Sequence, residues 1–244
     1  MSSSKYQFLL DMFALLLVVL VAAVSASAPI AVNGTTGLGI DVSQPLSTET
    51  AECLINSGYG SMIIARGYKS TGNPDSNYCG TVTNAKSAGY SEVGVYIFPC
   101  PTCGPAADQI NTLASELANC DAANSPNFKI WLDVEGSQYW LQDYGKNQAW
   151  YKDFVDACTG LMGKYSCGVY ASHSQWINLF GSTSFVYGSE QGLPLWYAHY
   201  DNDPSFDDYP KYAFGGWDKP WAKQYQGDQT LCNFGVDLNY LPYA

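Results

Sequence analysis

Short runs of apolar residues alternate along the chain with stretches in which apolar and polar residues recur at helical spacing. Six of the runs have the length and composition of buried strands: 37–42, 61–65, 92–98, 129–134, 167–171 and 193–199. Four of the stretches are predicted helices: 47–58, 82–88, 106–122 and 148–164. Strands that alternate with helices are typical of parallel βα units rather than of a β-sandwich.

The pattern changes in the C-terminal part of the chain. The segments 212–217, 222–226 and 234–238 are strand-like, but they are too closely spaced for full helices between them. No Gly/Ser linker or long charge run divides the chain, so we predict a single α/β domain. Its fold is an irregular TIM-like βα-barrel with closely spaced strands in the C-terminal part, and in such barrels the active site lies at the C-terminal ends of the strands.

The first 28 residues have the features of a signal peptide. Lys5 precedes the apolar run 12–24, and small residues follow at 25–28, so cleavage is expected after Ala26 or Ala28. The run is shorter than the roughly 20 residues that span a bilayer, so we expect no membrane attachment after cleavage. The predicted catalytic domain is 29–244, in a secreted protein whose further transport to a lysosome or phagosome is left open. Asn33 begins an Asn-Gly-Thr glycosylation acceptor.

Composition narrows the function classes. Lys and Arg number 11 against 22 Asp and Glu, and the resulting net charge of −11 argues against a nucleic-acid partner. The eight cysteines are an even number in a chain predicted to be secreted, which favours disulfides, including for the Cys-x-x-Cys pair Cys100 and Cys103. The pairing cannot be deduced from the sequence. His173 and His199 are the only histidines, and the acidic segment 201–208 lacks the glycine and distal Glu of a calcium loop, so we expect no metal and no cofactor.

Four acids stand at the ends of predicted strands. Asp41 ends the first strand, Asp133 and Glu135 end the fourth, and Asp237 lies in the last. Residues i and i+2 of a strand point to the same face, so Asp133 and Glu135 are expected to share one wall. Acids flanked by apolar residues are costly to bury unless they face a polar cleft, and only 11 cations are available to pair with them. Paired carboxylates whose ionisation is separated by their surroundings are what glycoside hydrolysis uses.

Aromatic residues accompany these acids. Aromatic rings can stack on the C–H faces of sugars, although filling the core is the commoner role for any single ring. We predict a carbohydrate cleft with these substrate-binding residues: Tyr96, Phe98, Trp131, Tyr170, Trp196, Tyr197 and Tyr225.

The ordered segments that carry these residues resemble glycoside hydrolase family 25, the Chalaropsis-type lysozymes or N-acetylmuramidases, in a eukaryotic secreted form. The resemblance rests on GIDVS at 39–43, GVYIF at 94–98, LDVEG at 132–136, LWYAHY at 195–200, QY at 224–225 and GVDLN at 235–239. The loops at 136–140 and 218–223 depart from the pattern, which leaves the substrate subsites undefined.

The resemblance implies hydrolysis of the β-1,4 bond between N-acetylmuramic acid and N-acetylglucosamine in bacterial peptidoglycan, for bacterial digestion or antibacterial defence. It implies that Glu135 is the general acid, and that Asp133 orients the substrate acetamido group or stabilises charge. Asp41 and Asp237 match the two remaining carboxylates of the cleft. We expect a monomer with an acid pH optimum. Two alternatives remain at this point: a catalytically silent carbohydrate-binding protein and a chitinase-like glycosidase.

Overall fold

The computed structural model describes residues 37–124, 128–161 and 165–243, and shows a closed barrel of eight strands with a ninth strand attached. The predicted signal peptide and Asn33 lie outside the described residues. In chain order the strands are β1 (Leu38–Val42), β2 (Met62–Lys69), β3 (Asn73–Pro74), β4 (Glu92–Ile97), β5 (Lys129–Val134), β6 (Ser166–Ala171), β7 (Leu195–Ala198), β8 (Ala222–Leu231) and β9 (Phe234–Tyr240).

Barrel closure is irregular at one place. The ring runs β1-β9-β8-β7-β6-β5-β4-β2, and a parallel pairing of β2 with β1 closes it. β9 is antiparallel to both of its neighbours, whereas all other pairs in the ring are parallel. The closely spaced final strands form a hairpin, because an antiparallel pair needs no crossover helix. The predicted irregular βα-barrel is confirmed.

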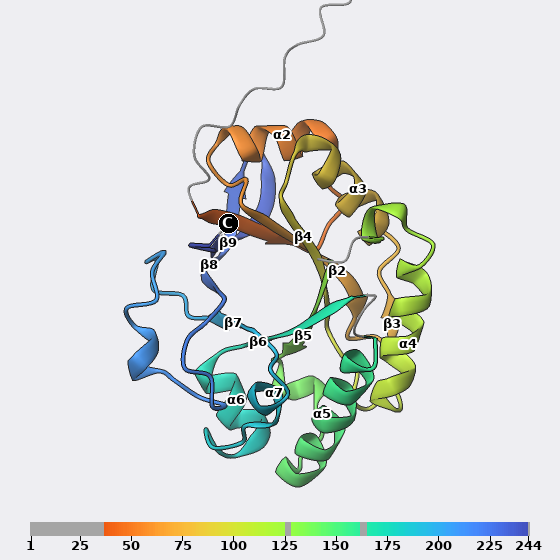
Figure 1. Cartoon of the computed structure of the whole chain (residues 1–244), viewed down its shortest axis with the longest axis vertical. Helices are drawn as coiled ribbons and strands as arrows, with labels where there is room; N and C mark the ends of the chain where they lie inside the picture. Colours follow the sequence, from red (N-terminus) through yellow and green to blue (C-terminus); the bar gives the residue numbers. More distant parts are fainter. Residues whose placement is uncertain (1–36, 125–127, 162–164, 244) are drawn as a thin grey trace, which may run out of the picture. The chain divides into compact units, whose positions relative to one another are not determined.

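Helices surround the barrel from α2 to α7, and loops cover the side that carries β7 and β8 (Figure 1). Their bounds are α2 (Thr48–Asn56), α3 (Tyr78–Ala88), α4 (Ala106–Leu117), α5 (Tyr144–Thr159), α6 (His173–Phe180) and α7 (Tyr187–Glu190). The Ser47 hydroxyl accepts a hydrogen bond from Thr50 N and so caps α2, at the start of the predicted helix 47–58.

One predicted strand is wrong and two helices were not predicted. Residues 212–217 follow a 3-10 turn and contain Gly215 and Gly216 at φ +62° and +78°, which interrupts an extended strand. Phe214 and Trp217 in this segment are buried, so its apolar character serves packing against α6. The short helices α6, capped by Ser172, and α7 were not predicted.

The core has two layers. The larger one lies between the strands and the helices, and the smaller one fills the barrel interior with Met62, Ile64, Trp131, Tyr170 and Trp196. Trp131 fits there because Gly168 on the adjacent strand has no side chain, and a Cβ at that position would overlap the Trp131 ring. The interior is therefore packed below its mouth, and chemistry is restricted to the strand ends.

All eight cysteines form disulfides, which confirms their predicted oxidation and fits an oxidising compartment. The pairs are Cys53–Cys232, Cys79–Cys120, Cys100–Cys103 and Cys158–Cys167. Among the described residues, no helix is both long enough and apolar enough to cross a membrane.

Candidate active site

The four predicted acids meet in one cavity at the C-terminal mouth of the parallel strands. The cavity has a volume of about 200 Å³ and is lined by Asp41, Asp133, Glu135 and Asp237. Asp41 and Asp237 are register partners across β1 and β9, while Asp133 and Glu135 lie on β5 and just beyond it. The i, i+2 relation predicted from the sequence thus places the second pair on one wall.

Amide side chains hold Asp41 in position. Gln224 Nε2 donates to Asp41 Oδ2 at 2.8 Å, and Asn239 Nδ2 donates to the same oxygen at 2.7 Å. Asn239 is fixed in turn, because its Oδ1 accepts a hydrogen bond from Trp196 Nε1 at 2.7 Å. Burial nevertheless raises the pKa of Asp41 well above its ordinary value, and the charge of Asp237 adds to this, while the two amides oppose it.

The amide of Gln224 is itself fully used. Its Oε1 accepts hydrogen bonds from Tyr170 at 2.6 Å and Tyr200 at 2.9 Å, and its Nε2 also contacts Asp237 Oδ2 at 3.4 Å. The two hydroxyls donate to the amide oxygen, and the N–H groups of Gln224 face the carboxylates, which accept hydrogen bonds.

Asp133 and Glu135 lie in surroundings that favour their neutral forms. Asp133 is 4% exposed, and its Oδ1 is enclosed without a hydrogen-bond partner among the described residues. Burial raises the pKa of Asp133 well above its ordinary value, and the charges of Glu135 and Asp41 raise it further. Burial also raises the pKa of Glu135, with a contribution from Asp237. A carboxyl group that stays protonated in this way can donate a proton.

Within the described part of the chain, none of the four acids forms an ion pair. Arg66 is the cation that lines the same cavity, but its Nε bonds Asp75 Oδ2 at 2.8 Å and its Nη2 bonds the Ser43 carbonyl at 3.0 Å. The four carboxylates therefore repel one another, and no cation of the described residues is paired with any of them. Such an arrangement is unusual outside functional sites.

The structure sorts the predicted substrate-binding aromatic residues into three groups. Four line the cavity: Tyr96, Phe98, Tyr170 and Trp196. Trp131 packs beneath Trp196 in the interior, with ring centroids 5.7 Å apart. Tyr197 and Tyr225 point out of the barrel into the outer core, so they do not fit the predicted sugar contacts.

Sequence reasoning missed Gln224, Tyr200 and Arg66 in this site. Gln224 precedes Tyr225 and Trp196 precedes Tyr197, so within each pair the two side chains point to opposite faces of their strand. This alternation could have told the residues that face the cavity from those that face the outer core. A polar residue such as Gln224 in an otherwise buried strand is a second signal of a side chain that faces the cavity.

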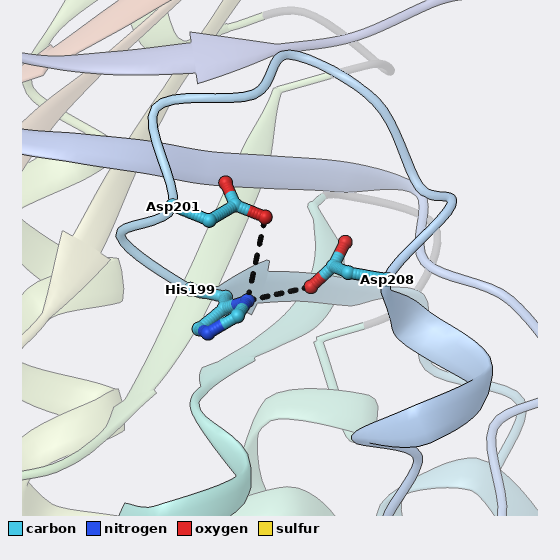
Figure 2. Close-up of side chains that lie close together, drawn as sticks. All are labelled: His199, Asp201 and Asp208. Atoms are coloured by element: carbon cyan, nitrogen blue, oxygen red, sulfur yellow. Dashed lines mark hydrogen bonds and ion pairs between the residues drawn. The ribbon is translucent and has the colours of Figure 1, made fainter.

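A second group of acids lies outside the barrel, in the loop after β7. Figure 2 shows His199, Asp201 and Asp208 converging, with His199 Nδ1 at 2.6 Å from Asp208 Oδ2 and 3.4 Å from Asp201 Oδ2. Their ligand atoms lie close enough together to hold a metal ion. The fully buried Lys223, however, places its Nζ at 2.7 Å from Asp201 and 2.8 Å from Asp208. The ammonium already supplies the positive charge, so this group holds the loop on β8.

Comparison with known proteins identifies the family. Residues 33–225 match the family model described as Lysozyme-like protein 1. "Probable GH family 25 lysozyme 2" of Dictyostelium discoideum is 42% identical over 205 residues, which cover 84% of this chain and 90% of that protein. "Lysozyme-like protein 5" of Caenorhabditis elegans is 37% identical over 213 residues, covering 84% and 91%.

A solved structure shares the fold. The muramidase from Trichobolus zukalii superposes with a TM-score of 0.64 at 22% identity, over 85% of this chain and 94% of that one. With this barrel and these relatives along most of its length, the chain belongs to the glycoside hydrolase family 25 lysozymes and is a glycoside hydrolase.

Proposed function

We propose that this protein is a lysozyme that hydrolyses the β-1,4 bond between N-acetylmuramic acid and N-acetylglucosamine in bacterial peptidoglycan. The observation that carries the proposal is the cavity in which Glu135 is gathered with three further acids at the barrel mouth. The names of the similar proteins, lysozyme and muramidase, support this substrate. We further propose that residues 29–244 form the catalytic domain of a secreted monomer that serves bacterial digestion or antibacterial defence, after removal of a signal peptide.

Glu135 is the proton donor in this proposal. Burial and the negative charge of Asp237 keep its carboxyl protonated above the ordinary range of a glutamate, and it is still partly open to the cavity. Its proton passes to the glycosidic oxygen as the C1–O bond breaks, so the leaving sugar departs as a neutral alcohol. The resulting carboxylate then accepts a proton from the water that attacks C1.

Asp133 acts on the substrate acetamido group. Its enclosed carboxyl lies beside Glu135 and has no partner at Oδ1 among the described residues, so it can hold the acetamido group against C1. The acetamido carbonyl oxygen then stabilises the positive charge at C1, in place of a protein nucleophile. Asp41 and Asp237 shape the field of the cavity and help to position substrate or water.

The test compares wild type with Glu135→Gln on purified peptidoglycan and on chitin, between about pH 4 and 8. We expect reducing ends from peptidoglycan with wild type only, a loss of about 10²- to 10⁴-fold in the variant, and the highest rate at acid pH. Acid pH keeps Glu135 protonated and weakens repulsion between the −11 protein and the anionic wall. Glu52→Gln, which removes the same charge from the exposed face of α2, is the matched control.

Two results would contradict the proposal. Release of sugars from chitin but not from peptidoglycan would make the protein a chitinase-like glycosidase. Binding to peptidoglycan with no bond cleavage by wild type, and with equal binding by Glu135→Gln, would make it a silent carbohydrate-binding protein.

A further inference from the structure

The cavity that holds the four acids continues in two directions. On one side lies a cavity of about 530 Å³, which we call the cationic arm; Arg66, Phe98 and Glu135 line both cavities. Lys69 and Tyr139 also line the cationic arm. On the other side lies a cavity of about 340 Å³, which we call the acidic arm; Asp41 and Asp237 line both cavities, and Asp228 also lines the acidic arm. A ligand that spans the acids therefore meets opposite charges at its two ends.

A change of register in β2 creates the cationic arm. Arg66 pairs with Tyr96 on β4, but Tyr68 pairs with the very next residue, Ile97, so Gly67 is an extra residue in the strand. Such a bulge shifts the alternation of side chains. Tyr68 consequently points into the outer core, while Arg66 and Lys69, three positions apart, both line the cavity.

Both cations have unused capacity. Lys69 forms no ion pair with any described residue. Arg66 uses two of its five N–H groups, toward Asp75 and the Ser43 carbonyl, and 32% of its side chain is exposed. Arg66 and Lys69 are therefore available to a ligand in the cationic arm, beside the proposed proton donor. The chain has only 11 Lys and Arg against 22 Asp and Glu, so two cations together are notable.

The turn after Lys69 and the aromatic residues of the cationic arm are held by packing contacts. The hairpin turn after Lys69 contains Gly72 at φ +82°, where a Cβ would lie 2.9 Å from Cys103 Sγ, so the Cys100–Cys103 disulfide packs directly against the turn. In the same cavity, Phe98 and Tyr139 form an edge-to-face pair with ring centroids 5.3 Å apart. Aromatic rings beside two cations suit a sugar ring that carries a carboxylate.

We propose that the cationic arm, through Arg66 and Lys69, is a subsite for a carboxylate borne by the glycan, and that it sets the direction in which the strand lies across the acids. A carboxylate placed in the acidic arm would be repelled by Asp228 and Asp237. In the cationic arm it would accept hydrogen bonds from Arg66 and Lys69. The carboxylate belongs to the peptide stem or, where N-acetylmuramic acid carries no stem, to its lactyl group, because an attached stem converts the lactyl carboxylate into an amide. The inference rests on the proposed peptidoglycan substrate.

The test measures kcat and KM for release of reducing ends from soluble, uncross-linked peptidoglycan, before and after its carboxyl groups are converted to neutral amides. Lys69→Gln is the informative variant, because substitution of Arg66 would strand the buried Asp75. Lys219→Gln is the matched control, since Lys219 is exposed and lines a separate cavity with Trp221 and Tyr243. We expect Lys69→Gln to raise KM about 3- to 10-fold on the native substrate with kcat almost unchanged, and Lys219→Gln to match wild type.

On the amidated substrate, wild type and Lys69→Gln should have the same KM. A third substrate, glycan strands freed of peptides by an amidase, identifies the source of the carboxylate. The amidase removes the stem carboxylates and frees the lactyl carboxylates, so persistence of the Lys69 effect shows that the arm accepts a free lactyl carboxylate, and its loss assigns the peptide stem. If wild type cleaves native peptidoglycan but Lys69→Gln behaves as Lys219→Gln does, the subsite is refuted while the hydrolase remains. If wild type cleaves none of these substrates, it is the proposed function that fails.

Discussion

Two groups of acids lie on either side of β8, and they are stabilised in opposite ways. Inside the barrel, Asp133 and its three companions have no ion pair within the described chain, and burial raises the pKa of each. Outside, Asp201 and Asp208 share the ammonium of Lys223. The pKa of Asp208 is lowered overall: burial tends to raise it, but hydrogen bonds from Lys223, Tyr197 and His199 outweigh that effect.

The inner group is suited to proton transfer, whereas the outer group stabilises the fold. A carboxylate that has a buried cation is stable as an anion and has little tendency to take up or release a proton near neutral pH. Carboxyl groups crowded together without a cation remain partly protonated, which costs stability and makes a proton available. Neighbouring residues of one strand, Lys223 and Gln224, serve the two groups, one on each face.

The largest expected effect tests the inner group. Asp133→Asn should lower the rate of peptidoglycan cleavage at least about 10²-fold, because the acetamido group loses its carboxyl partner. The same change should raise the free energy of unfolding at neutral pH by on the order of 1 kcal/mol, because the folded protein no longer holds a buried carboxyl whose pKa is raised.

The pH dependence of that gain has a defined sign. The folded pKa of Asp133 lies above its unfolded value of about 3.9, so wild type loses stability relative to the variant as pH rises above about 4, and the two converge below it. Urea unfolding of both proteins from about pH 3 to 7 measures this difference. Asp208→Asn should give the reverse sign, since that pKa is lowered in the folded state. Equal behaviour of the two variants would remove the distinction between the groups.

The next effect tests the outer group. Lys223→Met should lower the free energy of unfolding by about 3 kcal/mol, because it leaves Asp201 and Asp208 without their cation while the methionine keeps the packing volume. We take the low end of the range for broken buried pairs, since the side chains of Asp201 and Asp208 remain 21% and 17% exposed. Denaturant midpoints measure the loss, with Lys219→Met as the exposed control. A midpoint equal to that of wild type would show that the lysine does not hold the loop.

How far the sequence predicted these two regions depends on the range of the interactions. Asp41, Asp133 and Glu135 could be placed at strand ends because alternation and strand length are local properties. The bulge at Gly67 and the contact of Lys223 with the loop after β7 depend on residues that meet only after the barrel has closed. For the same reason, nothing in the sequence of the acidic segment 201–208 distinguishes Asp208, which holds this loop on β8, from its neighbours.

The smallest expected effect concerns the link between the two groups. Tyr200 lies between His199 and Asp201 in the outer loop, yet its hydroxyl donates to Gln224 Oε1 at 2.9 Å inside the cavity of the four acids. Tyr200→Phe should lower kcat about 3- to 10-fold, the value of one hydrogen bond, with little change in stability because Tyr170 still holds the amide oxygen. Tyr243→Phe, at an exposed ring, is the control and should leave kcat unchanged.

The double variant shows whether the outer group acts through this hydroxyl. If Lys223 positions Tyr200, then Lys223→Met and Tyr200→Phe should reduce kcat by similar factors, and together by no more than either alone. Multiplied losses in the double variant would mean that the loop and Tyr200 influence the site separately. The outer ion pairs would then stabilise the barrel without tuning the carboxylates on the other face of β8.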